Sequence, residues 1–210
     1  MNERQENVYQ QYPTYENFLA AQGPNQILIN FSNIHEIEES ISVPRLSIAE
    51  MNEIYLRNDF NPGIDYYVKW LNFFNKFSNI NKAMPMDIVN WAAIQLYLRY
   101  CHFYFADLKV IFEKILEAKY GKFFGSVDTV LIMSAFLQYN EERERLLHKE
   151  KERKAIEYES WRKVRSEQLR TEVYNELSSK HPDWLTGQIY EHMNQVVVQR
   201  IALEAKERFK

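Results

Sequence analysis

Apolar residues recur every three or four positions along most of the chain, which is the spacing that places them on one side of an α-helix. Ser47 and Glu50 have the spacing of a capping box, so one helix is expected to begin there. The pattern predicts four helices in the centre of the chain, over residues 47–57, 64–77, 85–100 and 105–119. Their buried sides are expected to include Tyr67, Trp70, Leu71, Phe74, Phe77, Ile88, Trp91, Ala92, Leu96 and Tyr97.

The pattern changes in the second half of the chain. A strongly apolar helix is expected from Val127 to Leu137, followed over residues 141–170 by a charged helix with pairs such as Glu150 and Lys154 at helical spacing. Residues 178–182 end in a proline and predict a break. A last helix is expected over residues 184–209, with an apolar side formed by Ile189, Met193, Val196, Val197, Ile201 and Ala205.

Residues 1–45 have the least regular pattern. Thr14 is a good N-cap for a short helix that reaches about Ala21, where Gln22, Gly23 and Pro24 stop it. The apolar, β-prone residues 26–31 are expected to form a lone strand or an extended arm on the core.

These patterns predict an all-α protein, with a compact helical core followed by a long charged helix and a C-terminal helix, and with an irregular N-terminal arm. The chain has five glycines and six prolines, too few for the tight turns of an all-β sandwich. We expect three parts: the arm over residues 1–45, the core domain over residues 46–140 and a helical arm over residues 141–210.

Charge and targeting signals point to a protein that stays where it is made. The net charge of −3 gives no general signal for nucleic acid or membrane, although acids dominate the first sixty residues. The single cysteine, Cys101, excludes an internal disulfide. The polar N-terminus lacks the apolar region of a signal peptide, and no apolar stretch is long enough to span a bilayer. We therefore expect a cytoplasmic protein without membrane contact.

The sequence contains no motif that indicates catalysis. His148 and Glu152 have the spacing of two metal ligands on one helix, but the surrounding lysines and arginines repel cations. Lys122 follows Gly121 without the other residues of a phosphate-binding loop, and no nucleophile elbow is present. The chain is expected to be neither an enzyme nor a metalloprotein, and to need no cofactor.

The strip of residues 119–124 combines two lysines, three aromatic residues and a glycine. One hypothesis is a turn that binds nucleic acid, with Lys119 and Lys122 on phosphates and Tyr120 available for stacking. The alternative, which explains every residue by structure alone, is a helix C-terminus closed by Gly121 in the left-handed conformation. Residues 143–170 hold ten lysines and arginines, but the interleaved glutamates oppose DNA binding.

Trp161 is a lone tryptophan on the charged helix. Such a residue often anchors a contact, either with the last helix of the same chain or with a partner protein. The apolar side of the last helix also needs a cover, and folding back onto the Trp161 region would satisfy both. The candidate partner-binding residues are Trp161, Met193, Val197 and Ile201.

Residues 65–144 resemble a family of small helical proteins encoded by phages and mobile elements of Bacteroides-like bacteria. The resemblance is carried by residues 70–79 with Met84, by residues 105–112, and above all by residues 119–124 followed by 127–132. It implies that Asp107 and Asp128 act at or near helix starts, on either side of the turn at Gly121. The helix pattern is distantly similar to small phage helicase loaders, which implies a replicative helicase as partner.

Three hypotheses follow for the function. The first is a phage replication accessory, an adaptor or loader that docks on a helicase. The second is a structural or packaged virion component that assembles through its long helices with other virion proteins. The third is direct DNA contact through Lys119, Lys122 and the basic residues of the long helix.

Overall fold

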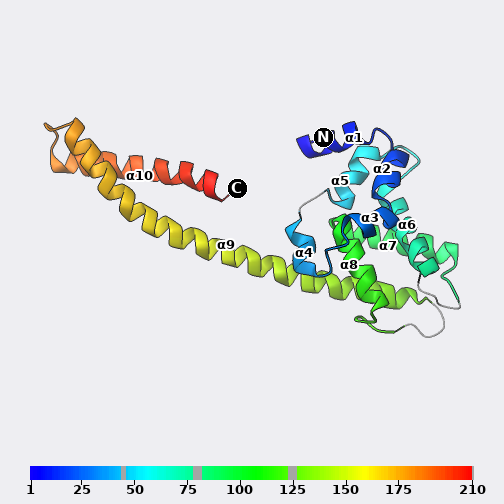
Figure 1. The fold of residues 1–210 in the computed structure, drawn as a ribbon. Helices are drawn as coiled ribbons and strands as arrows, with labels where there is room; N and C mark the ends of the chain where they lie inside the picture. The colour runs from blue at the N-terminus through cyan, green and yellow to red at the C-terminus, as the bar shows by residue number, and fades with distance from the viewer. Residues whose placement is uncertain (44–45, 78–81, 123–126, 210) are drawn as a thin grey trace. The chain divides into compact units, whose positions relative to one another are not determined.

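The structure is a computed structural model that describes residues 1–43, 46–77, 82–122 and 127–209. All named elements of these described residues are helices, which confirms the predicted all-α fold (Figure 1). The chain divides into two compact units, residues 1–147 and residues 148–210. Among the described residues, no helix combines the length and the apolar composition required to cross a bilayer.

The first unit contains eight of the helices found in the described residues and the beginning of a ninth, which continues into the second unit. In chain order they are α1 (Glu3–Gln11), α2 (Tyr15–Gln22), α3 (Pro24–Asn30), α4 (Ile37–Ser42), α5 (Ile48–Tyr55), α6 (Pro62–Phe77), α7 (Met86–Tyr100), α8 (Phe105–Leu116) and α9 (Thr129–Lys180). The second unit contains the rest of α9 together with α10 (Thr186–Arg208).

The N-terminal segment packs onto the core as short helices. The predicted helix after Thr14 is confirmed as α2, and the Thr14 hydroxyl accepts a hydrogen bond of 3.3 Å from the Asn17 amide. The strand or extended arm predicted over residues 26–31 is wrong, because this stretch forms most of α3. Ile27 and Phe31 lie four residues apart, on one side of the helix, and both are buried. An apolar run such as residues 26–31 can therefore form a helix when the core covers that side.

Capping and aromatic packing explain the centre of the first unit. The Ser47–Glu50 capping box forms as predicted at the start of α5. Trp70 of α6 is completely buried and stacks on Phe112 of α8, with ring centroids 5.1 Å apart and planes 2° from parallel. Phe77 was predicted to be buried as well, but it is 60% exposed, because it lies on the last residue of α6 and packs on Phe73 instead.

The second unit is a helical hairpin, in which α10 runs back along the second part of α9 (Figure 1). The predicted break at residues 178–182 and the last helix are confirmed. Arg165 of α9 forms a two-pronged ion pair with Glu204 of α10, at 2.7 and 2.9 Å. Glu176 accepts a hydrogen bond of 2.7 Å from Arg200 nearer the turn. Both pairs fix α9 and α10 in an antiparallel arrangement.

Candidate interaction surfaces

A completely buried carboxylate, that of Asp107, joins three helices of the first unit. Its Oδ1 accepts hydrogen bonds from the Ser40 hydroxyl at 2.8 Å and from the Tyr139 hydroxyl at 2.7 Å. Its Oδ2 accepts one from the Tyr104 amide at 2.8 Å and lies 3.3 Å from the Arg143 guanidinium. A buried charge is tolerated when it is paired and hydrogen-bonded in this way. Asp107 thus has a structural task at the third position of α8, near the helix start.

The environment keeps the Tyr139 hydroxyl in its neutral, donating form. Burial of the ring raises the pKa of Tyr139 well above its ordinary value, and the negative charge of Asp107 raises it further. The neighbouring Arg143 lies over the rings of Phe103 and Tyr104, with its guanidinium carbon 5.4 and 5.5 Å from their centroids. The interaction between a cation and an aromatic face helps to hold this buried arginine in place.

Two buried lysines of α8 are also occupied by the chain itself. Lys109 donates to the backbone oxygen of Ile34 and, at 2.7 Å, to the Glu113 carboxylate. Lys114 donates at 2.8 Å to the carboxylate of Glu36, and this hydrogen bond lowers the pKa of Glu36. The two lysines therefore hold the segment before α4 against α8. Their positive charges are paired with the carboxylates of Glu113 and Glu36.

The helix that precedes the lysine-rich strip ends earlier than predicted. We expected Gly121 to close it in the left-handed conformation, but Ala118 takes that role with a φ of 58°. The Ala118 amide donates to the oxygen of Ile115, and the Lys119 amide donates to the oxygen of Lys114, which together make a Schellman motif. Glycine usually occupies the left-handed position, so an alanine there hides this helix end from sequence analysis.

Gly121 follows in the turn, with a φ of 119°. A Cβ atom at this position would lie 2.7 Å from the side chain of Leu131, so both the backbone conformation and the close approach favour glycine. Asp128 then caps α9: its Oδ1 accepts a hydrogen bond of 2.8 Å from the Val130 amide. Gly121 and Asp128 thus both have structural tasks.

The described residues of the strip, 119–122, differ in exposure. The Tyr120 ring is buried, and burial raises the pKa of its hydroxyl, so it offers little surface for base stacking. Lys119 forms an ion pair of 3.1 Å with Glu142, while Lys122 is exposed. Phe123 and Phe124, the last residues of the strip, lie outside the described residues. A phosphate contact by Lys119 would compete with its ion pair to Glu142.

The outer side of α7 is an unexpected apolar surface. Ile88, Trp91, Ile94 and Leu98 follow one another at intervals of three and four residues, and they are 37%, 53%, 40% and 68% exposed. We call these four side chains the α7 face. The prediction that Ile88 and Trp91 point into the core is wrong, because the buried side of α7 consists of Val89, Ala92, Ala93, Leu96 and Tyr100.

The reason lies in the composition of α7. Apolar residues occur on both of its sides, so hydrophobic periodicity gives no contrast that could orient it. The structure packs α7 along α6, and the alanines among its buried residues allow a close approach there. Sequence analysis missed Ile94 and Leu98 for the same reason. One signal in the sequence could have indicated the exposed face: α7 has more large apolar residues than its buried side can accommodate.

The predicted partner-binding residues of the second unit lie together. Met193, Val197 and Ile201 of α10 pack with Leu169 and Val173 of α9 in a small buried cluster. The possibility that the last helix folds back onto the charged helix is therefore confirmed within this unit. A partner that contacted the three α10 side chains would have to displace α9.

Trp161 lies at the end of this cluster. It is half-buried, and its ring packs edge-on against Phe209, with centroids 5.3 Å apart. The side chain of Arg208 lies over the same ring, 5.9 Å from its centroid. Trp161 thus closes the hairpin against the end of the chain.

Residues 83–177 match the model of a family of unknown function, DUF6633. This span is less than half of the chain and includes α7, α8 and nearly all of the described α9. It overlaps the region in which the sequence resembles an uncharacterised family. No curated protein and no solved structure matches the chain.

Proposed function

We propose that the protein is a non-catalytic adaptor that binds a partner protein through the α7 face. The observation that carries the proposal is the exposure of Trp91 and Leu98 among the four apolar side chains of the α7 face. Contiguous apolar patches on a protein surface often mark interaction sites, and tryptophan is prominent among residues that dominate binding energy.

The interior of the first unit supports an adaptor rather than an enzyme. The buried charged groups Asp107, Lys109 and Lys114 are held by partners from the same chain. These contacts hold α4, α8 and α9 to one another and leave few charged groups free for a substrate. A rigid helix that presents its side chains in fixed positions is suited to docking, since less conformational entropy is lost on binding.

The partner that we propose is a replicative helicase or another protein of DNA replication. Support comes from the resemblance of residues 65–144 to small helical phage proteins with a helix pattern similar to that of helicase loaders. The α7 face lies within this span and also within the residues that match the family model. In this proposal the contact surface is on the first unit, because the apolar side of α10 is already covered by α9.

A pull-down with the full chain tests this proposal. Tagged protein is expressed in the bacterial host, the lysate is treated with nuclease, and bound proteins are identified by mass spectrometry. The variant Trp91→Glu with Leu98→Glu places two carboxylates on the α7 face and should lose the helicase. The control Ile156→Glu with Val164→Glu makes the same change at two exposed apolar positions of α9, and it should retain the helicase.

Several outcomes would overturn the proposal. Equal recovery of the partner with both variants would exclude the α7 face. Loss of the partner with the α9 control alone would move the docking surface to the second unit. Recovery of capsid, portal or tail proteins in place of replication proteins would identify a virion component instead.

A further inference from the structure

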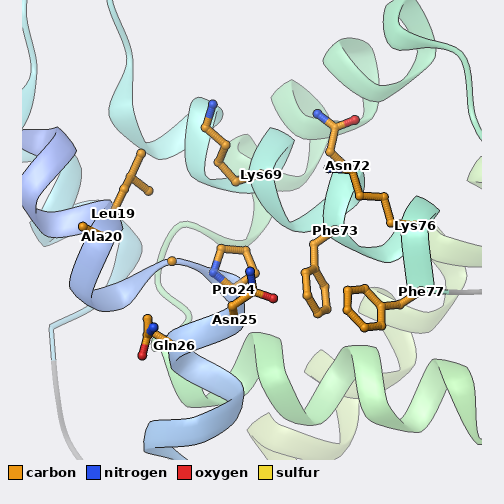
Figure 2. Close-up of a pocket in the computed structure, with 11 residues that line it drawn as sticks. Leu19, Ala20, Pro24, Asn25, Gln26, Lys69, Asn72, Phe73, Lys76 and Phe77 are labelled. Carbon is orange, nitrogen blue, oxygen red and sulfur yellow. The ribbon is translucent and has the colours of Figure 1, made fainter.

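The first unit has a second surface with a different chemistry, a groove between α2–α3 and α6 with a volume of about 440 Å³. Leu19 and Pro24 line one side, and Phe73 and Phe77 line the other. Figure 2 shows the two phenylalanine rings beside each other on α6, with Pro24 and Asn25 next to Phe73. The volume lies at the lower end of the range of ligand pockets, which suits one or two bulky side chains.

The apolar part of the groove is incompletely covered by the protein. The rings of Phe73 and Phe77 stack with centroids 4.3 Å apart, and Phe77 remains 60% exposed. Removing such apolar surface from water is favourable. An apolar side chain from another molecule would gain this free energy by packing between Pro24 and the two rings.

The polar part of the groove is positively charged. Lys69 and Lys76, both exposed, contribute to the lining, and among the described residues no aspartate or glutamate does. Lys69 lies 3.4 Å from the Asp65 carboxylate, an exposed pair that is weak in water, and Lys76 has no ion pair among the described residues. This local charge contrasts with the chain's net charge of −3, so the groove is electrostatically complementary to carboxylates.

Amide side chains complete the lining. Asn25, Gln26 and Asn72 carry both hydrogen-bond donors and acceptors, which match the backbone of an extended peptide. Two lysines are few for a nucleic-acid strand, whose affinity rises with the number of neutralised phosphates. The stacked phenylalanines also cover part of each other's ring faces, which a nucleic-acid base would need for stacking.

We propose that this groove binds a short acidic peptide segment of a partner protein. One bulky apolar side chain of the peptide packs against Phe73, Phe77 and Pro24, and flanking carboxylates pair with Lys69 and Lys76. The groove and the α7 face have no residue in common, so the groove would give the adaptor a second binding site for its partner. Two weak sites that act together raise the overall affinity without any new contact.

Fluorescence anisotropy with the full chain tests the proposal. The probe is a labelled ten-residue peptide with one central phenylalanine flanked by glutamates. We expect saturable binding that weakens at high salt, and at least a tenfold loss when the glutamates are replaced by glutamine or the phenylalanine by serine. A wild-type protein that binds the glutamine peptide equally well would overturn the proposal.

Variants locate the binding site. Lys69→Glu with Lys76→Glu should weaken binding of the acidic peptide at least tenfold, and Phe77→Ser should weaken it similarly. The control Lys151→Glu with Lys163→Glu changes the net charge equally at exposed lysines of α9 and should bind like the wild type. Equal affinity in all three variants, or no binding by the wild type, would overturn the proposal.

Two further measurements separate the alternatives. The first is the affinity of a single-stranded oligonucleotide. If it binds more tightly than the peptide, and if the Lys69 and Lys76 substitutions abolish this binding, the groove is a nucleic-acid site. The variant Trp91→Glu with Leu98→Glu should still bind the peptide, because its changes lie outside the groove lining. A failure of the α7 proposal therefore leaves the groove proposal standing, and the reverse also holds.

Discussion

The Tyr139 hydroxyl donates a hydrogen bond of 2.7 Å to Oδ1 of Asp107, and both side chains are completely buried. The contact joins α9 to α8 at a place where the hydroxyl of Ser40, from α4, reaches the same carboxylate oxygen. A buried carboxylate that loses a donor without gaining water keeps its desolvation cost. The Tyr139 oxygen should therefore contribute measurably to the stability of the first unit.

The variant Tyr139→Phe removes this oxygen and leaves the ring in place. We expect the free energy of unfolding to fall by about 1–3 kcal/mol, measured by urea denaturation followed by circular dichroism. The control is Tyr9→Phe, because Tyr9 is 45% exposed and its change should stay within about 0.5 kcal/mol. Equal losses in the two variants would show that the Asp107 contact contributes nothing specific.

Two glycines at the second position of a helix should respond to alanine in opposite directions. A Cβ atom on Gly63 would lie 2.2 Å from the Tyr97 ring, so Gly63→Ala is expected to destabilise the protein by about 1–3 kcal/mol. Gly187 has nothing within 4 Å of such an atom, and Gly187→Ala should stabilise its unit by up to about 1 kcal/mol. Thermal unfolding of both variants provides the measurement. Stabilisation by Gly63→Ala would contradict the close approach of α6 and α7.

Replacement of two tryptophans tests the orientation of α7. Trp70 is completely buried, and Trp70→Ala should cost about 3–5 kcal/mol through the cavity that it leaves. Trp91 is 53% exposed, so Trp91→Ala should cost no more than about 1 kcal/mol. Acrylamide should quench the fluorescence of the Trp70→Ala protein more strongly than that of Trp91→Ala. If Trp91→Ala destabilised the protein more than Trp70→Ala, Trp91 would lie in the core and the α7 face would not be exposed.

The hairpin of the second unit should weaken in acid because of Glu176. Hydrogen bonds from Lys180 and Arg200 lower the pKa of Glu176 to about 2, from an ordinary value of 4.5. A depressed pKa contributes stability that is present above the ordinary value and is lost as the pH falls toward the folded-state value. Because the carboxylate is exposed, salt should reduce the effect.

The comparison of wild type with Glu176→Gln measures this contribution. At pH 6 the wild type should unfold at the higher temperature, and the difference should shrink between about pH 4.5 and pH 2 as Glu176 becomes protonated. Repeating the series in 1 M salt gives the control for screening. A difference that stays constant over this pH range would mean that Glu176 acts through packing rather than charge.

The sequence by itself determined where helices begin and end wherever the local chemistry is strong. Thr14 and the Ser47–Glu50 box cap their helices as expected, and the break before α10 falls where Pro182 stands. The apolar side of α10 was also predictable from the sequence, because Met193, Val197 and Ile201 recur at helical spacing among polar residues. Capping and amphipathic periodicity act over a few residues, so a single sequence contains the information that sets them.

Only the tertiary structure decided which apolar residues remain exposed. Residues 26–30 lie in a helix because the core covers Ile27 and Phe31. The helix α7 is apolar on both sides, and its packing along α6 left Trp91 and Leu98 outside. Burial depends on neighbours that are distant in sequence, and local pattern has no access to them. Both proposed binding surfaces contain residues of this kind, so neither was visible before the helices were packed.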